Sequence, residues 1–281
     1  MGKGEDKEMI RRRERQIRLM KRIILVFFCF LLGFSSAVAE KMKRVPIESG
    51  INPPAKISPF CFWRMEYSGG KEGKYKPFLM NDKNGKFKKL SGFKGKPRVD
   101  LKSGIYCSYG SPGDLRGNDL NKSKEVVSPD GDQSIRFYWN MTFADDENNV
   151  WLILKNTKTK REEKVFYPGS CMGLVSPLFW NGPKNLFYFM VGGGVTTDSS
   201  SGLFQFDVSD KSFLYVGTTN GRAFLSPDNK WVVWETGRMM SECGVGYKMY
   251  CTHLVLYDVD KGKNYQLTDG KSVNLFDHWK E

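Results

Sequence analysis

Residues 226–234 read SPDNKWVVW, and residues 254–263 read LVLYDVDKGK. In the first stretch a Ser-Pro-Asp-Asn turn precedes four apolar residues, because Pro sets the dihedral angle at the second turn position and Asp or Asn suits those that follow. In the second stretch an apolar run of strand length ends in an Asp-rich segment with Gly262, which predicts a tight turn. Each stretch therefore predicts a β-strand next to a turn, and the fold depends on how often the pair recurs.

Both patterns recur along the chain. Ser-Pro dipeptides open comparable segments at residues 58, 128, 176 and 226, and the strand-and-turn pattern begins at residues 77, 151, 203 and 254. A third apolar run closes each unit, and a further strand is expected before the next Ser-Pro. Two patterns that keep one spacing, close to 50 residues in the last three units, indicate a structural repeat.

Four short strands per unit, joined by turns and loops, describe one antiparallel blade of a β-propeller. Residues 231–234 are apolar at consecutive positions, as expected of strands covered on both faces. No stretch after residue 40 shows a 3.6-residue apolar period, so helix is expected to be scarce. The predicted fold is all-β, a propeller of four or five four-stranded antiparallel blades, preceded by an N-terminal signal or anchor helix.

The number of blades depends on two segments. The first two Ser-Pro dipeptides lie 70 residues apart, so residues 98–127 form either an insertion or a degenerate fifth blade. Residues 272–279 follow the last unit and are predicted to return to the first blade and complete it.

The repeat resembles the TolB-type β-propeller repeat. The resemblance rests on the apolar strands, the L-x-L-x-D-x-x-x-G-K pattern, Leu267-Thr268 and the repeat turns. The turn residues are Ser128, Pro129, Asp130, Gly131, Ser226, Pro227 and Asp228. The resemblance implies a propeller over residues 58–281. It carries no function, because such repeats occur in envelope scaffolds and in accessory domains of peptidases.

The first 39 residues are expected to be a targeting segment. Residues 1–22 hold nine Lys and Arg, residues 23–34 are apolar, and the small residues Ala37 and Ala39 stand before Glu40. This order predicts a signal peptide cut after Ala39, with an uncleaved membrane anchor of residues 23–39 as the alternative. The remaining chain is then exported, with the periplasm as the expected compartment, and residues 40–57 form a linker or a closing strand.

Composition excludes several classes of protein. The 281 residues include 44 Lys and Arg against 31 Asp and Glu, a formal charge of +13, and 40% of the residues are hydrophobic. This hydrophobic content is too high for a disordered chain, and a single long apolar run excludes a polytopic membrane protein. Much of the basic excess lies in the leader, so nucleic acid is not an expected partner. The residual positive charge favours an anionic membrane surface or a polysaccharide.

Export also permits disulfides. Cys243 and Cys251 flank a seven-residue segment, and we predict that they pair. The states of Cys61, Cys107 and Cys171 stay open, because five cysteines follow the leader and an odd number leaves one without an intrachain partner. There is no Cys-x-x-Cys pair, and the two histidines are far apart in sequence, so neither a metal site nor a cofactor is expected.

No catalytic constellation is recognised in the sequence. Residues 192–194 are three glycines but lack the Lys-Ser/Thr and the helix of a phosphate loop, and residues 169–173 have the spacing of a nucleophile elbow without the helix that must follow. Catalytic and cofactor-binding residues are therefore predicted to be absent. We expect an exported, non-enzymatic binding or scaffold protein of the cell envelope.

Its partner would be a protein, a peptide or a glycan, held by the long loops between second and third strands. The loops span residues 68–73, 143–149, 192–202 and 236–251. The alternative is a propeller-type hydrolase or lyase, for example one that acts on glycans, with carboxylates at the central channel. Two or three carboxylates gathered at one channel mouth would favour this enzyme.

Overall fold

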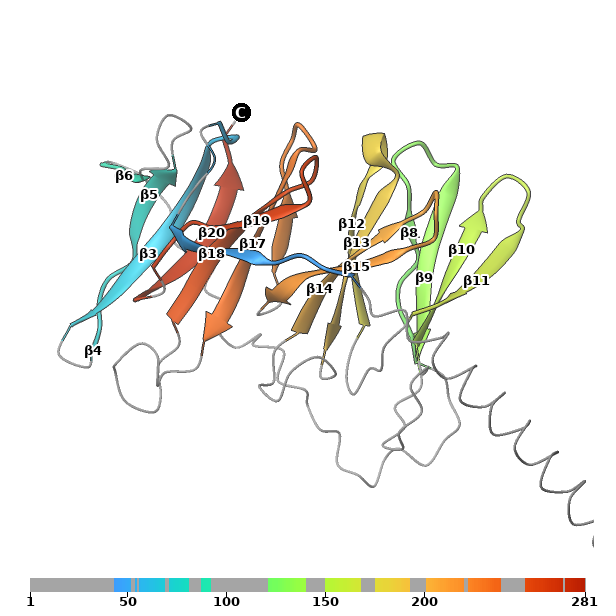
Figure 1. Cartoon of the computed structure of the whole chain (residues 1–281), viewed down its shortest axis with the longest axis horizontal. Helices are drawn as coiled ribbons and strands as arrows, with labels where there is room; N and C mark the ends of the chain where they lie inside the picture. The colour runs from blue at the N-terminus through green and yellow to red at the C-terminus, as the bar shows by residue number, and fades with distance from the viewer. Residues whose placement is uncertain are drawn as a thin grey trace, which may run out of the picture. The chain divides into compact units, whose positions relative to one another are not determined.

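Four β-sheets make up nearly all the regular structure of the computed structural model (Figure 1). The described residues are 43–51, 54, 56–68, 71–80, 87–91, 121–139, 150–167, 175–192, 201–219, 222–238, 251–269 and 271–280. They belong to a unit that begins at Lys43. The expected signal peptide or anchor, with Ala37 and Ala39, lies outside the described residues. Within the part of the chain that is described, no helix has the length and apolar character needed to span a membrane.

The four sheets are named here by their order along the chain. The first sheet contains β20 (Ser272–Trp279), β3 (Phe60–Ser68), β5 (Lys76–Met80) and β6 (Phe87–Lys89), with β4 (Lys71–Glu72) beside β3. The second contains β7 (Asn121–Lys122), β8 (Val126–Val127), β9 (Gln133–Trp139), β10 (Val150–Asn156) and β11 (Glu162–Phe166). The third contains β12 (Val175–Asn181), β13 (Leu186–Gly192), β14 (Ser201–Asp207) and β15 (Phe213–Thr219). The fourth contains β16 (Ala223–Leu225), β17 (Trp231–Arg238), β18 (Cys251–Asp258) and β19 (Lys263–Gln266).

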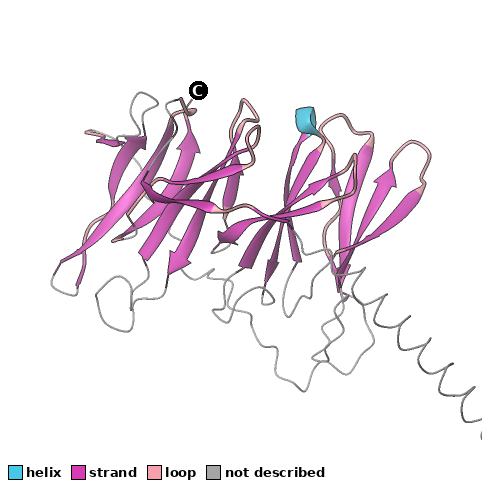
Figure 2. Cartoon of the chain, viewed as in Figure 1, coloured by secondary structure: helices cyan, strands magenta, loops and turns pink. Residues whose placement is uncertain are grey.

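The strands named above pair antiparallel with their neighbours in each sheet, in the order expected of a propeller blade. Helix is nearly absent, as predicted: the described residues contain one 3₁₀ turn, η2 (Gly182–Lys184), shown in cyan in Figure 2. The fold is therefore all-β and of the β-propeller kind. Whether residues 98–127 hold a fifth blade falls largely outside the described residues. The last of them form β7 and β8, which pair with β9 at the edge of the second sheet.

The C-terminal strand completes the first sheet. β20 pairs antiparallel with β3, with Phe276 opposite Phe62 and Val273 opposite Met65. The return of residues 272–279 to the first unit is thus confirmed. β20 lies in the first sheet, but in the chain it directly follows β19 of the fourth sheet. It therefore connects the first sheet to the fourth.

Neighbouring sheets pack through large apolar side chains. All seven residues of β13 are buried. Tyr188 lies in a cluster shared with Trp234 of the fourth sheet, and Phe189 packs against Phe137 of the second sheet at 4.7 Å between ring centroids. A second cluster joins Phe60 of the first sheet to Leu256 of the fourth. Burial of each such side chain contributes about 1.5–3 kcal/mol relative to exposure, so the runs of consecutive apolar residues are explained by sheets on both sides.

The turn of the third unit lies later in the chain than the sequence predicts. Ser176 and Pro177 were expected to form a turn, but both lie inside β12, where the pairing with β13 is irregular after Pro177. Pro has no N–H to give to a ladder, and it is tolerated in an edge strand such as β12 or at such a bulge. The turn before β13 is η2 instead, and Asn185, the C-cap residue after it, has a φ of 53°.

Residues 43–51 add strands to the outer edges of two sheets. β1 (Lys43–Arg44) pairs parallel with β15, and β2 (Ile47–Ile51) pairs parallel with β19. Between them the Val45 N–H donates to Tyr215 O at 3.0 Å. The buried Asn264 amide donates to Val216 O at 2.6 Å and to Val45 O at 3.4 Å. This segment, drawn in blue in Figure 1, therefore ties the third sheet to the fourth.

Candidate functional site

The repeat turns lie at one end of their sheets. One turn joins β8 to β9 in the second sheet, and the other joins β16 to β17 in the fourth. In the second sheet the Ser128 hydroxyl donates to Asp130 Oδ1 at 2.5 Å and accepts the Gln133 N–H at 3.0 Å. In the fourth sheet Ser226 makes the same contact with Asp228 at 2.5 Å and accepts the Trp231 N–H at 2.9 Å. The Ser and Asp of the repeat therefore satisfy the backbone of the turn, and Pro129 and Pro227 stand between them.

These hydrogen bonds favour the ionised carboxyl groups. The Ser128 hydroxyl and the Asp132 N–H lower the pKa of Asp130. For Asp228 burial acts to raise the pKa, but the hydroxyls of Ser226 and Ser58 outweigh it and the pKa is lowered. Since Ser58 belongs to the segment before β3, its 2.9 Å hydrogen bond to Asp228 also links the first and fourth sheets. The turn residues thus have a structural role at this end.

The cysteines divide between a disulfide and a free thiol. Cys251 is disulfide-bonded, and its partner lies outside the described residues, as does Cys243, so the Cys243–Cys251 pairing stays a prediction. Cys61 is free and buried, and burial raises the pKa of its thiol. Cys107 and Cys171 are outside the described residues, as are residues 193–194, 169–173 and most of the predicted long loops. In the described part of the chain no three His, Cys, Asp or Glu side chains gather into a metal-binding group.

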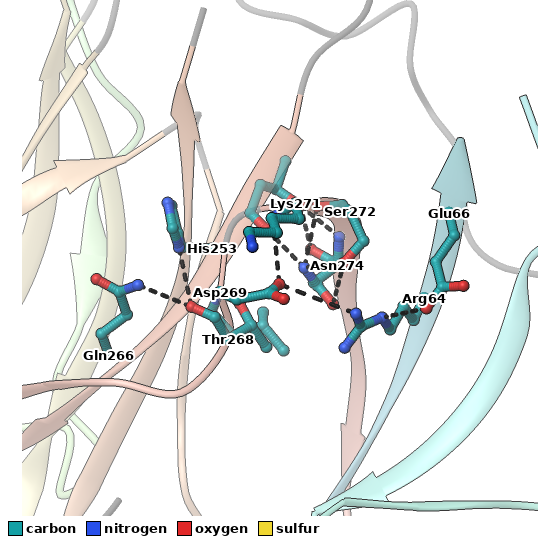
Figure 3. A network of polar contacts seen from close by, with 11 residues as sticks. Arg64, Glu66, His253, Gln266, Thr268, Asp269, Lys271, Ser272 and Asn274 are labelled. Carbon is teal, nitrogen blue, oxygen red and sulfur yellow. Dashed lines mark hydrogen bonds and ion pairs between the residues drawn. The ribbon is translucent and has the colours of Figure 1, made fainter. Parts of the chain in front are cut away.

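A cluster of charged groups lies at the opposite end of the first sheet from the repeat turns. Arg64 of β3 lies with Nε 3.2 Å from Glu66 Oε1 and with Nη2 3.9 Å from Asp269 Oδ1 (Figure 3). Asp269 belongs to the segment between β19 and β20, and its Oδ1 accepts the Lys271 N–H at 3.2 Å. The guanidinium carbon also lies 5.3 Å from the centre of the Phe87 ring. One guanidinium thus holds two carboxylates from segments that are far apart in sequence.

Buried polar groups fix the segment that carries Asp269. His253 Nδ1 donates to Thr268 O at 3.0 Å, and the Gln266 amide donates to the same oxygen at 2.8 Å. Carbonyls only accept, so His253 carries its proton on Nδ1 in this contact. The Thr268 hydroxyl accepts the Leu254 N–H at 3.0 Å. The residue next to Asp269 is therefore held by three contacts from the fourth sheet.

The inner edge of β20 is also bonded to the fourth sheet. The Thr252 hydroxyl donates to Asn274 O at 2.6 Å and accepts the Asn274 N–H at 2.5 Å. The Phe276 N–H donates to Glu235 Oε1 at 2.8 Å, and Arg222 Nη1 lies 3.8 Å from the same oxygen. Side chains therefore replace a neighbouring strand along this edge.

The carboxylates differ in their access to solvent. The side chain of Glu235 is 1% exposed, whereas that of Asp269 is 34% exposed and that of Glu66 is 67% exposed. Glu235 is thus shielded from solvent, and its carboxylate accepts the backbone N–H of Phe276. Glu66 and Asp269 can meet a ligand from solvent, and they are held near each other by Arg64.

No motif in the sequence points to Glu66 or Asp269. The only local signal for Glu66 is that Arg64 and Glu66 are charged at alternate positions of a strand that begins with four apolar residues. Asp269 directly follows the Leu267-Thr268 pair of the repeat. The contact between them depends on the pairing of β20 with β3, which no local pattern shows.

Comparison with known proteins gives similarity of fold only. No protein-family model matches the sequence, and a search of curated proteins finds no match. Among solved structures, the chain is similar to the β-propeller domain of the trilobed protease from Pyrococcus furiosus, with 10% identity, a TM-score of 0.37 and coverage of 82% of this chain and 58% of that one. It is also similar to the tricorn protease, with 10% identity, a TM-score of 0.36 and coverage of 78% and 17%. For an acylaminoacyl peptidase from Pyrococcus horikoshii, the identity is 10%, the TM-score is 0.35 and the coverage is 78% and 32%.

These matches correct two expectations. The three proteins are named as proteases or a peptidase, which contradicts the expectation of a non-catalytic envelope scaffold and the expectation that the chain is not an enzyme. The chain spans less than two thirds of each of these three proteins, and the similarity supports a β-propeller without singling out the TolB type.

Proposed function

We propose that this chain is a β-propeller hydrolase that cleaves a glycosidic bond where Arg64, Glu66 and Asp269 meet. The observation that carries the proposal is the approach of two partly exposed carboxylates to one guanidinium, at 3.2 and 3.9 Å. Glycoside hydrolysis needs two carboxyl groups that flank the bond. One donates a proton to the leaving oxygen, and the other activates water or attacks the sugar carbon.

Arg64 acts as the positioning residue. Its side chain is 14% exposed and lies over Phe87, so its ion pairs hold both carboxylates beside one fixed guanidinium. Catalysis depends on such placement, because a reacting group held in the right geometry avoids the entropic cost of meeting its substrate. Asp269 is held further by the Lys271 N–H and by the contacts of Thr268 described above.

The repeat is assigned to the TolB type as part of the same proposal. Its support is the Ser–Asp hydrogen bond of 2.5 Å, which recurs at Ser128 and at Ser226 with the same spacing to the following strand. Export through the predicted signal peptide and an envelope location complete the proposal, since an extracytoplasmic glycan is then within reach.

The test is turnover of a panel of polysaccharides by the full chain, measured as the release of reducing ends. The panel contains polygalacturonate, peptidoglycan, cellulose and dextran. We expect turnover of at least one polymer, and a fall in kcat of about 10²–10⁴-fold in Glu66→Gln and in Asp269→Asn.

Glu163→Gln is the matched control, because Glu163 is a partly exposed carboxylate of β11 that pairs with Lys211 far from this cluster. It is expected to keep the full rate. Full activity in both site variants with unchanged circular dichroism would contradict the proposal. Products with a new carbon–carbon double bond would also contradict it, because they are formed by a lyase and not by hydrolysis.

A further inference from the structure

One face of the second sheet presents a row of aromatic rings. Trp151 of β10 lies directly opposite Tyr138 of β9 on one side and Phe166 of β11 on the other. Directly paired residues of antiparallel strands share a face, so the three rings form one row across the sheet. The rings of Tyr138 and Trp151 lie 6.3 Å apart at an interplanar angle of 15°. The rings of Tyr138 and Trp151 are therefore nearly parallel.

This face is open to solvent, unlike the other face of the same sheet. Phe137 and Leu152 are fully buried, and Phe137 packs on Phe189 of the third sheet, whereas Phe166 is 56% exposed and Val127 is 52% exposed. Val127 pairs with Ser134 and belongs to the same face as Tyr138. Among the described residues these two are the large hydrophobic side chains left exposed. Exposed apolar groups gathered on one face mark an interaction site more often than single exposed residues do.

Positive charges accompany the rings. Lys164 Nζ lies 4.4 Å from the centre of the Trp151 ring and 4.9 Å from that of Phe166, and the Arg136 guanidinium lies 5.3 Å from that of Tyr138. Lys122 stands opposite Tyr138 at the inner end of the row. No carboxylate of the described residues forms an ion pair with Lys122 or Lys164. Their charges are therefore available to an anionic ligand.

We propose that this face of β9, β10 and β11 binds an acidic polysaccharide. Sugar rings present flat apolar faces that pack on aromatic rings, and carboxylates on the sugars accept charge-assisted hydrogen bonds from Lys and Arg. A row of three rings with ammonium groups beside it offers both contacts along an extended chain. The surface lies on a different sheet from Arg64, so it provides a second place at which a polymer is held.

The pattern of charge disfavours a nucleic acid as the ligand. Each nucleotide carries a phosphate, and binding needs a dense track of Lys and Arg. Here the same face also bears Glu162, which pairs with Arg136 at 2.9 Å, and Glu125, which lies 3.9 Å from Lys155. Two ammonium groups that pair with no carboxylate of the described residues, beside acids that are paired, fit a polymer of lower charge density.

The test measures binding to polygalacturonate by isothermal titration calorimetry, with dextran as the neutral polymer and oligodeoxythymidine as the nucleic acid. All titrations use the full chain with Glu66→Gln and Asp269→Asn, so the result does not depend on turnover. We expect binding to polygalacturonate that weakens about tenfold in Trp151→Ala and about threefold in Lys164→Ala. Binding is also expected to weaken as salt is added.

Lys158→Ala is the matched control, because Lys158 is an exposed lysine in the turn after β10 that pairs with Asp132 at 2.7 Å. It is expected to bind as the parent does. Equal affinity for polygalacturonate in the parent and in Trp151→Ala, with both folded by circular dichroism, would overturn the proposal. Equal binding to dextran, or tighter binding to oligodeoxythymidine, would overturn it as well.

Discussion

At the residue scale, the repeat turns depend on residues that accept a positive φ. Gly131 has a φ of 77°, and the equivalent residue of the fourth sheet, Asn229, has a φ of 60°. Gly reaches this region without strain, Asn tolerates it, and other residues are disfavoured there. The two turns thus use different residues to reach one conformation.

Gly131→Ala is expected to lower the free energy of unfolding by about 1 kcal/mol, because no atom lies within 4 Å of the added Cβ and only the backbone is strained. Urea denaturation measures the change. Asn229→Gly is the control, and it is expected to differ from wild type by less than about 0.5 kcal/mol, since relief of strain offsets the added freedom of the unfolded chain. Equal destabilisation by both changes would contradict the role given to φ.

The same turns predict a dependence of stability on pH. The pKa values of Asp130 and Asp228 are lowered from 3.8 in the folded chain. Both groups therefore contribute stability that is full above the unfolded pKa and is lost as the pH falls through the folded pKa. In Asp130→Asn the loss of stability between pH 7 and about pH 3 should be smaller than in wild type, as measured by urea denaturation. An identical loss in the two proteins would show that Ser128 does not favour the ionised group.

At the scale of elements, β20 is held by side chains along its inner edge. Thr252→Val keeps the shape of the side chain but leaves the N–H and C=O of Asn274 without the hydroxyl that they share. Since Thr252 is 5% exposed, we expect a loss of about 1–3 kcal/mol in the free energy of unfolding. Thr159→Val, in the exposed turn after β10, is expected to change it by less than about 0.5 kcal/mol. A loss no greater than that of the control would exclude this edge contact as a source of stability.

At the scale of the whole molecule, the C-terminal strand β20 connects the first sheet with the fourth through aromatic contacts. Phe276 of β20 packs on Phe224 at 4.5 Å, on Trp279 at 5.5 Å and on Phe60 at 5.6 Å between ring centroids. It thereby connects the C-terminal strand with both the fourth and the first sheets. The repeat alone does not supply this connection, because each unit is formed by local turns.

Phe276→Ala is expected to lower the free energy of unfolding by about 3–5 kcal/mol, because it removes a buried ring and leaves a cavity. Phe166→Ala is the matched control on the exposed face of β11 and is expected to cost less than about 1 kcal/mol. Urea denaturation followed by tryptophan fluorescence measures both. Similar losses in the two variants would contradict the view that β20 joins the first and fourth sheets.

The sequence predicted the features that are encoded locally. The turns at Ser128 and Ser226, the strands after them and the scarcity of helix follow from turn chemistry and apolar runs, and the return of residues 272–279 follows from a strand left without a unit. The prediction of the third turn at Ser176-Pro177 is wrong. This Ser-Pro dipeptide matches the repeat pattern but lies inside β12, and the turn before β13 is η2.

The candidate site could not be read from the sequence. Glu66 and Asp269 meet only through the register of β20 on β3, which is set by packing between distant segments. The aromatic row of the second sheet likewise follows from cross-strand pairing that local patterns do not specify.

The pH dependence of glycan turnover tests the central claim most directly. If Glu66 and Asp269 act as the two carboxyl groups of a hydrolase, wild type should give a bell-shaped profile of kcat/KM, and each single variant, Glu66→Gln or Asp269→Asn, should lose one limb of the bell. A wild-type profile that both variants retain in full, or the absence of turnover on every polysaccharide of the panel, would contradict the claim.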